Sequence, residues 1–119
     1  MTGSKRIHRI SSELKKALSK IIFKDLNIEK LKSASINHVK ISPDLSVANI
    51  YYSSIRNDPD SIEETGKLLR HNNKQIRMKL QKYMSLRKMP ELRFFYDDTL
   101  DNAYKIEELL NSVKKDKDE

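Results

Sequence analysis

The chain has 119 residues, and its 24 lysines and arginines against 17 aspartates and glutamates leave a formal net charge of +7 at pH 7. Hydrophobic residues make up 37% of the sequence, enough for one small core, so the composition indicates a single globular domain and excludes wholesale disorder. Without cysteine there is no disulfide, thiolate zinc site or cysteine nucleophile. The longest apolar runs have three residues, whereas a helix needs about 20 apolar residues to span a bilayer. We therefore expect a cytoplasmic protein with no membrane partner.

The first predicted element is a basic amphipathic helix. Its apolar residues recur at intervals of three and four, as in a helix that buries one face, and they are Ile7, Ile10, Leu14, Ala17, Leu18, Ile21 and Ile22. The cations mostly lie off this stripe, and they are Lys5, Arg6, Arg9, Lys15, Lys16 and Lys20. This pattern is typical of any solvated surface helix and equally of one that binds an anionic partner.

Two strands joined by a tight turn are predicted next, over 33–41 and 46–54, because both stretches are rich in β-branched and aromatic residues. Between them, Pro43 and Asp44 suit the two central positions of a type I turn. The pattern therefore predicts a β-hairpin.

Side-chain alternation predicts which face of this hairpin is buried. The second strand alternates with Ala48, Ile50 and Tyr52 on one face, whereas the alternation in the first strand slips between Ile36 and Val39. Such a slip indicates a bulge or an exposed His38.

A second helical region is predicted to follow a loop at 57–61, whose aspartates and serine suit an N-cap. Its apolar stripe is interrupted over 70–74, where Asn72 and Asn73 are adjacent. Because asparagine is poor in a helix interior, we predict two helical pieces joined by a kink at these two residues. Met89-Pro90 is predicted to end the helical run.

A short third strand over 92–96 and a last helix complete the pattern. Asp97, Asp98 and Thr99 suit the N-cap of that helix, whose apolar positions run over 100–113, and the polar residues 114–119 are predicted to fray. The order is helix, strand, strand, helix, kink, helix, strand, helix. It predicts an α+β fold with a three-stranded sheet and helices on one face.

The positive charge is concentrated in two segments. Residues 1–24 carry seven cations and one anion, and residues 67–93 carry nine cations and one anion, whereas the remaining segments are net acidic. Such clustering favours an anionic macromolecule as partner. The two glycines, Gly3 and Gly66, are too far apart to form a glycine-rich phosphate loop, which excludes the nucleotide enzymes that depend on one.

Two stretches carry a resemblance to a known family. Residues 39–52 read VKISPDLSVANIYY, and residues 76–98 read IRMKLQKYMSLRKMPELRFFYDD. Together they closely resemble ribosome-binding factor A, a bacterial family similar to the type II KH fold, and the similarity runs from about Arg6 to Val113. The chain departs from the family at the kink, where Asn72, Asn73 and Lys74 replace the usual alanine, any residue and glycine.

The resemblance implies a function. A member of this family is expected to be a non-catalytic assembly factor that binds rRNA during late maturation of the small (30S) ribosomal subunit, and that supports rRNA 5′-end processing and growth in the cold. It implies a KH-like rRNA-binding domain over 1–113, a charged tail over 114–119, a monomer off the ribosome, and no cofactor, metal or small-molecule substrate. The alternative, from charge alone, is a general single-stranded nucleic-acid-binding protein without ribosome preference.

The candidate RNA-binding residues are the cations and amides around the kink, those of the following helix and loop, and two cations of the first helix. The central phosphate contacts are assigned to Arg70, Lys74 and Arg77. The full set is Arg70, Asn72, Asn73, Lys74, Arg77, Lys79, Lys82, Arg87 and Lys88, with Arg6 and Arg9 on the first helix. For Arg87 and Arg93, a structural role beside Asp97 or Asp98 is equally compatible with the sequence.

Other chemistries are less well supported. A hydrolase that uses Asp97 and Asp98 is a third hypothesis, but a helix cap explains both carboxylates. His8, His38 and His71 do not have the spacing of metal ligands on one face, although His71 could contact RNA beside the kink. The aromatic residues Tyr52, Phe94 and Tyr96 are predicted to lie in the core, so no stacking platform is expected and RNA recognition through shape and phosphates is favoured.

Overall fold

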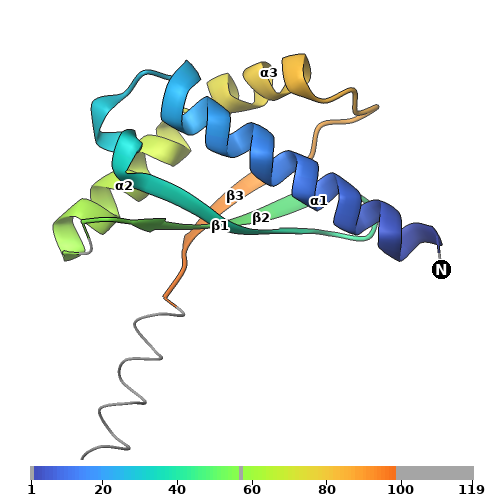
Figure 1. Ribbon diagram of the computed structural model, residues 1–119, viewed down its shortest axis with the longest axis horizontal. Helices are drawn as coiled ribbons and strands as arrows, with labels where there is room; N and C mark the ends of the chain where they lie inside the picture. Colours follow the sequence, from blue (N-terminus) through green and yellow to red (C-terminus); the bar gives the residue numbers. More distant parts are fainter. Residues whose placement is uncertain (1, 57, 99–119) are drawn as a thin grey trace, which may run out of the picture.

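The computed structural model describes residues 2–56 and 58–98 (Figure 1). The elements in chain order are helix α1 (Thr2–Lys20), the π-helical turn η1 (Ile21–Asp25), the 3-10 turn η2 (Glu29–Ser33), strands β1 (Ala34–Ile41) and β2 (Val47–Ser54), helices α2 (Pro59–His71) and α3 (Asn73–Tyr83), and strand β3 (Glu91–Tyr96). The predicted last helix and the tail at 114–119 lie outside the described residues.

Helix α1 confirms the predicted amphipathic helix. Ile10, Leu14, Ala17 and Leu18 are buried along one side, and the cations of the helix remain exposed. At its end the helix widens into η1, where the amide of Leu26 donates to the carbonyl of Ile21 over 2.9 Å. This single wide turn keeps Ile21 and Ile22 in the core while the chain changes direction.

The hairpin of β1 and β2 closes through the turn that the sequence predicts. The amide of Leu45 donates to the carbonyl of Ser42 over 2.9 Å, and the Asp44 carboxylate accepts from the hydroxyls of Ser42 and Ser46 at 2.8 and 2.7 Å. The backbone amide of Ser46 adds a third bond to the same carboxylate oxygen, at 3.1 Å. These bonds hold the pKa of Asp44 at about 2, below its usual 3.8. The SPDLS motif is therefore accounted for by turn structure.

Both predictions about strand alternation are confirmed. The β1–β2 register shifts between Ile36 and His38, and His38 is exposed. Ala48, Ile50 and Tyr52 are buried on the opposite face. The extra residue in β1 restores the buried face after the shift, so that Val39 and Ile41 again point into the core.

The connection from α3 to β3 differs from the prediction. We expected Met89-Pro90 to end the helical run, but α3 ends at Tyr83 because Met84 adopts an extended conformation with φ −134° and ψ 130°. The Met84 side chain turns into the core, where only 7% of it is exposed. The helix therefore ends where Met84 enters the core, six residues before the proline that was predicted to end it. Met89 packs against the core from the loop between α3 and β3.

The sheet has the order β1-β2-β3, with β1 and β2 antiparallel and β2 and β3 parallel. Figure 1 shows α1 and α3 on the same side of this sheet, and α2 packs against β2 and β3. The core lies between the helices and one sheet face, as in the predicted α+β fold. Among the described residues, no helix is long and apolar enough to cross a membrane.

Candidate nucleic-acid interface

The kink predicted at the paired asparagines is confirmed at Asn72. This residue lies between α2 and α3 with φ −95° and ψ 11°, and its amide donates to the carbonyl of Leu68 over 3.0 Å. Its side-chain amide donates to the same carbonyl over 2.8 Å, and its own carbonyl accepts from the amide of Ile76 over 2.9 Å. Asn72 therefore ends one helix and begins the next without a positive φ, so Lys74 fits in the first turn of α3 without requiring glycine there.

Three of the candidate residues anchor this kink to β3 and the loop before it. Asn73 donates through its side-chain amide to the carbonyl of Leu92 over 2.9 Å. Arg70 donates to the carbonyl of Phe94 over 3.3 Å, and Arg77 donates to the carbonyl of Met89 over 3.2 Å. Arg77 is half-buried, and its enclosed Nε has no hydrogen-bond partner within the described residues. Part of the positive charge at the kink is thus committed to holding the helices on the sheet.

Arg70 also lies beside the hydroxyl of Tyr52 in β2. Burial raises the pKa of the Tyr52 hydroxyl, and the neighbouring Arg70 charge opposes that rise. The approach is close because Gly66 leaves space: a Cβ there would lie 2.5 Å from the Tyr52 hydroxyl oxygen and 2.9 Å from Arg70 Nη1. Gly66 therefore serves helix-to-sheet packing, which is a different role from a phosphate-binding glycine.

The cations of α3 that remain available are lysines. Lys74 and Lys82 are exposed and Lys79 is half-buried, and within the described part of the chain none of them forms a hydrogen bond or an ion pair. Arg87 and Lys88 are exposed in the loop that follows α3, and the Arg77–Met89 bond holds this loop against the helix. Unpaired cations in water are the groups that a phosphate backbone can neutralise at least cost.

The two positive segments of the sequence meet where α1 packs against α3. Lys20 Nζ lies 5.4 Å from the centre of the Tyr83 ring, and Lys16 lines the same small hollow. The Tyr83 hydroxyl donates to the Asp25 carboxylate, which raises the pKa of Tyr83. We refer to the lysines of these two helices, Lys16, Lys20, Lys74, Lys79 and Lys82, together as the lysine surface.

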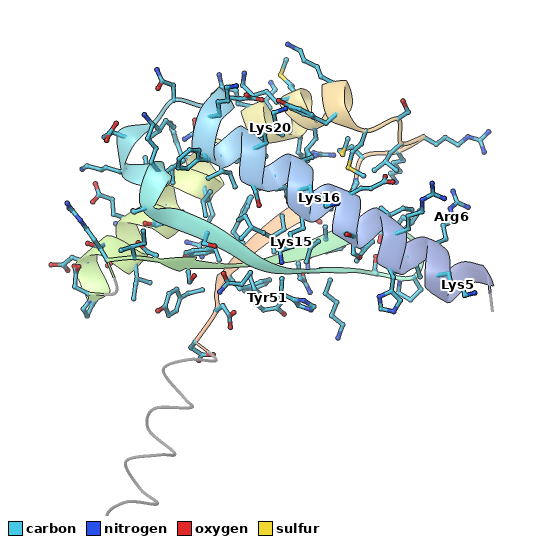
Figure 2. All side chains as sticks on the ribbon, in the orientation of Figure 1. Lys5, Arg6, Lys15, Lys16, Lys20 and Tyr51 are labelled. Carbon is cyan, nitrogen blue, oxygen red and sulfur yellow. The ribbon has the colours of Figure 1, made fainter. Side chains whose placement is uncertain are left out.

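The N-terminal cations lie apart from this surface. Figure 2 shows Lys5 and Arg6 near the beginning of α1 and Lys20 at its other end. Both Arg6 and Arg9 are exposed, and Arg9 forms an ion pair with Glu13 over 3.6 Å. The structure therefore does not bring Arg6 and Arg9 to the kink, and they can only extend the footprint along α1.

A hollow of about 700 Å³ between α1, η1 and the edge strand β1 was not expected from the sequence. Lys15, Lys16, Lys20 and Lys24 surround it, and the ring of Phe23 lies in its wall with 58% of the side chain exposed. The periodicity of α1 had marked three of these lysines as solvent-facing. Only the position of β1 beside the helix turns them into the rim of a concave surface.

The carboxylate of Asp97, directly after β3, has a structural partner. The Asn37 side chain donates to Asp97 over 3.0 Å, and the Asp97 amide donates to the carbonyl of Tyr52 over 2.7 Å. Arg93, which the sequence offered as a partner of Asp97 or Asp98, lies 3.4 Å from Glu91. The predicted cap of the last helix includes Thr99 and falls outside the described residues.

Histidines and acids do not gather into a metal site in the part of the chain that is described. His8, His38 and His71 are exposed on α1, β1 and α2, and His71 is the last residue before the kink.

The aromatic residues of the sheet are divided between its two faces. Tyr52 and Phe94 are buried as predicted and Tyr96 is half-buried, but their neighbours Tyr51 and Phe95 face away from the core. The Tyr51 ring lies 5.9 Å from the His38 ring and 5.7 Å from the Phe95 ring, measured between centroids. Alternation along each strand points to these residues, but only the sheet register reveals that they adjoin.

Comparisons with known proteins agree on one family. The family model described as ribosome-binding factor A matches residues 6–110. The chain is 38% identical over 104 residues to ribosome-binding factor A of Hydrogenovibrio crunogenus, covering 86% of each protein. It is 33% identical over 108 residues to that of Phytoplasma mali, covering 90% of this chain and 95% of the relative.

Two structures share the fold. The crystal structure of ribosome-binding factor A from Thermus thermophilus matches 76% of this chain and 94% of its own, with a TM-score of 0.67 and 23% identity. A homology model of the Thermus thermophilus ribosome binding factor A, fitted into the cryo-EM map of a 30S-RbfA complex, matches 74% of this chain and 91% of its own, with a TM-score of 0.61 and 23% identity.

Proposed function

Because the chain belongs to the ribosome-binding factor A family, we propose that it is a non-catalytic assembly factor that binds rRNA of the small ribosomal subunit. The observation that carries this proposal is the lysine surface, where α1 and α3 place cations that form no hydrogen bond or ion pair within the described residues. The Thermus thermophilus relative that was fitted into a 30S complex supports the choice of partner.

The contacts would form mainly with phosphates. The exposed lysines donate from flexible stems, so they hold a backbone of suitable shape without selecting bases. Arg70 and Arg77 already donate to main-chain carbonyls, and each retains further N–H groups on its guanidinium that a phosphate could accept from. Lys74 is then the leading phosphate contact at the kink, with Lys82 and Lys20 continuing the surface.

The biological setting follows from the family. We propose that the protein acts in the cytoplasm during late maturation of the small subunit, supports processing of the rRNA 5′ end and growth in the cold, and is a monomer when off the ribosome. No covalent step is assigned to it, and the hydrogen bond from Asn37 gives a structural role to Asp97, one of the two carboxylates of the hydrolase hypothesis.

A general single-stranded nucleic-acid binder is the second candidate, and the row of rings at His38, Tyr51 and Phe95 favours it. The two candidates differ in what competes for the protein. An assembly factor prefers the structured small subunit over unrelated RNA, whereas a general binder has similar affinity for both.

Cosedimentation distinguishes them. The full chain is mixed with immature small subunits, mature small subunits or large subunits, and unrelated naked RNA is added as competitor. We expect the chain to sediment with the small subunit, preferentially the immature form, despite excess competitor. Loss of all sedimentation when competitor is added would favour the general binder and exclude ribosome preference.

A further inference from the structure

The sheet face turned away from the helices carries a continuous row of rings, one from each strand. His38 pairs with Tyr51 in the β1–β2 register, and Tyr51 pairs with Phe95 in the β2–β3 register. Neighbouring rings are tilted by 34° and 30°. Figure 2 shows Tyr51 on the side of the sheet away from α1. We call the surface formed by His38, Tyr51 and Phe95 the open-face row.

This row is accessible in the described part of the chain. His38 is exposed, 42% of Phe95 is exposed, and Tyr51 is half-buried between them. Isolated apolar side chains on a surface are ordinary, but three adjoining rings form a patch that can offer stacking faces to a ligand.

Charges around the row are arranged asymmetrically. On one side, Lys40, Asn49 and Arg93 occupy neighbouring positions on the three strands, directly beside the rings. Lys40 has no ion pair within the described residues, and the contact of Arg93 with Glu91 is exposed at 3.4 Å. Asp97 and Asp98 line a shallow hollow of about 350 Å³ that also contains His38, Tyr51 and Lys40. Lys40 and Arg93 can therefore attract a phosphate beside the rings, whereas the two carboxylates repel one from their end of the row.

We propose that the open-face row binds unpaired bases of single-stranded RNA, with the bases stacked on His38, Tyr51 and Phe95 and the phosphates beside Lys40 and Arg93. This inference rests on the proposed function for the identity of the nucleic acid, and it adds a base-stacking surface separate from the lysine surface. Only unpaired RNA fits, because a base inside a duplex has no free face to place on a ring.

The charged residues of the same face favour RNA over an apolar helix as the occupant. Lys40 and Arg93 are exposed beside the rings. A phosphate can pair with these cations, whereas an apolar helix would bury them without a partner at a free-energy cost. Residues 100–113 of this chain, or a second copy, are the competing occupants.

The test is an NMR titration of the full chain with an oligoadenylate about eight nucleotides long, a length suited to a single stacking site. We expect the ring resonances of His38, Tyr51 and Phe95 to shift. The variant Tyr51→Ala/Phe95→Ala should bind about 100-fold more weakly, because each stacked base contributes roughly tenfold or more. Tyr51→Phe keeps the ring and should retain binding.

A second variant covers the case in which removal of both rings unfolds the protein. Lys40→Glu/Arg93→Glu leaves all three rings in place. It should weaken binding of the oligonucleotide about tenfold, because phosphate contacts are lost. Lys74→Glu/Lys82→Glu should leave the ring shifts in place, because those lysines belong to the other surface. If Lys74→Glu/Lys82→Glu instead keeps both the ring shifts and the wild-type sedimentation with small subunits, the result counts against the proposed function and not against the open-face row.

Three results would overturn the proposal. One is unchanged oligonucleotide affinity in a folded Tyr51→Ala/Phe95→Ala variant. Another is a set of nuclear Overhauser contacts from these rings to methyl groups of residues 100–113 that persist when RNA is added. The third is a set of ring shifts that depend on protein concentration and not on RNA, which would identify a second copy as the occupant.

Discussion

Asn73 donates a hydrogen bond to the main-chain carbonyl of Leu92 over 2.9 Å, and so joins the first turn of α3 to β3. The kink between the helices is therefore held from the sheet as well as from the helix ends. The position of the kink relative to β3 determines where Lys74, the residue after Asn73, can contact a partner.

Replacing this asparagine tests how firmly the kink is held. Asn73→Ala should lower the free energy of unfolding by roughly 0.5–1.5 kcal/mol, because the carbonyl of the buried residue Leu92 loses its donor. Urea unfolding measures the change. The control is Gln75→Ala, an exposed position in the same turn, where the change should stay within about 0.5 kcal/mol. Equal stability of the two variants would show that the bond to Leu92 contributes nothing.

The packing of α2 on the sheet depends on Gly66. Helix propensity alone predicts that Gly66→Ala stabilises α2 by about 1 kcal/mol. The structure predicts the opposite sign, a loss of roughly 1–3 kcal/mol, because the new methyl group would lie 2.5 Å from the hydroxyl oxygen of the buried Tyr52 ring.

A double-mutant cycle isolates this contact. In a Tyr52→Phe background the hydroxyl is absent, so Gly66→Ala should cost much less. The free energy of unfolding of the four proteins gives the coupling. The steric explanation fails if Gly66→Ala costs the same in both backgrounds.

The hairpin turn predicts how the stability of the protein changes at acidic pH. Asp44 has a pKa of about 2 in the folded protein against 3.8 ordinarily, so its ionised form is favoured by folding. The stabilisation is fully present above pH 3.8 and is lost as the pH falls through about 2. Asp44→Asn should therefore lower the melting temperature at neutral pH, and the gap to the wild type should close as the pH approaches 2. A gap that stays constant with pH would contradict the role of the carboxylate.

Local patterns predicted much of the fold. The three-and-four spacing in α1, the alternation around Ile50 and the paired asparagines at the kink each reflect geometry that neighbouring residues determine. The end of α3 could not be predicted in this way. Met84 leaves the helix to fill the core, and that preference depends on side chains from distant segments.

The candidate site was predictable only in part. Charge clustering identified the cations of α1 and α3, but it could not separate Lys74, which is unpaired among the described residues, from Arg70 and Arg77, which donate to carbonyls of distant segments. The open-face row depends on the parallel pairing of β2 with β3, which brings Tyr51 beside Phe95 although the two are remote in sequence. Pairing between strands that are distant in sequence depends on the topology of the whole sheet, so local sequence patterns do not predict it.

The central claim is that the lysine surface binds the small ribosomal subunit. Lys74 and Lys82 can be changed without breaking any hydrogen bond or ion pair of the described chain, unlike Arg70 and Arg77. Lys74→Glu/Lys82→Glu is therefore the informative variant. Lys30→Glu/Lys32→Glu, on η2, is a control with the same change in charge, and it breaks two exposed ion pairs, Lys30–Glu64 and Lys32–Glu29, which contribute little to stability. Circular dichroism checks that both variants are folded.

Cosedimentation with immature small subunits over a series of salt concentrations compares the two variants with the wild type. We predict that Lys74→Glu/Lys82→Glu loses most of its binding, with a slope of log affinity against log salt shallower by about 0.7 for each phosphate contact removed, while Lys30→Glu/Lys32→Glu binds like the wild type. Equal binding by both folded variants, with the same salt dependence, would contradict the account.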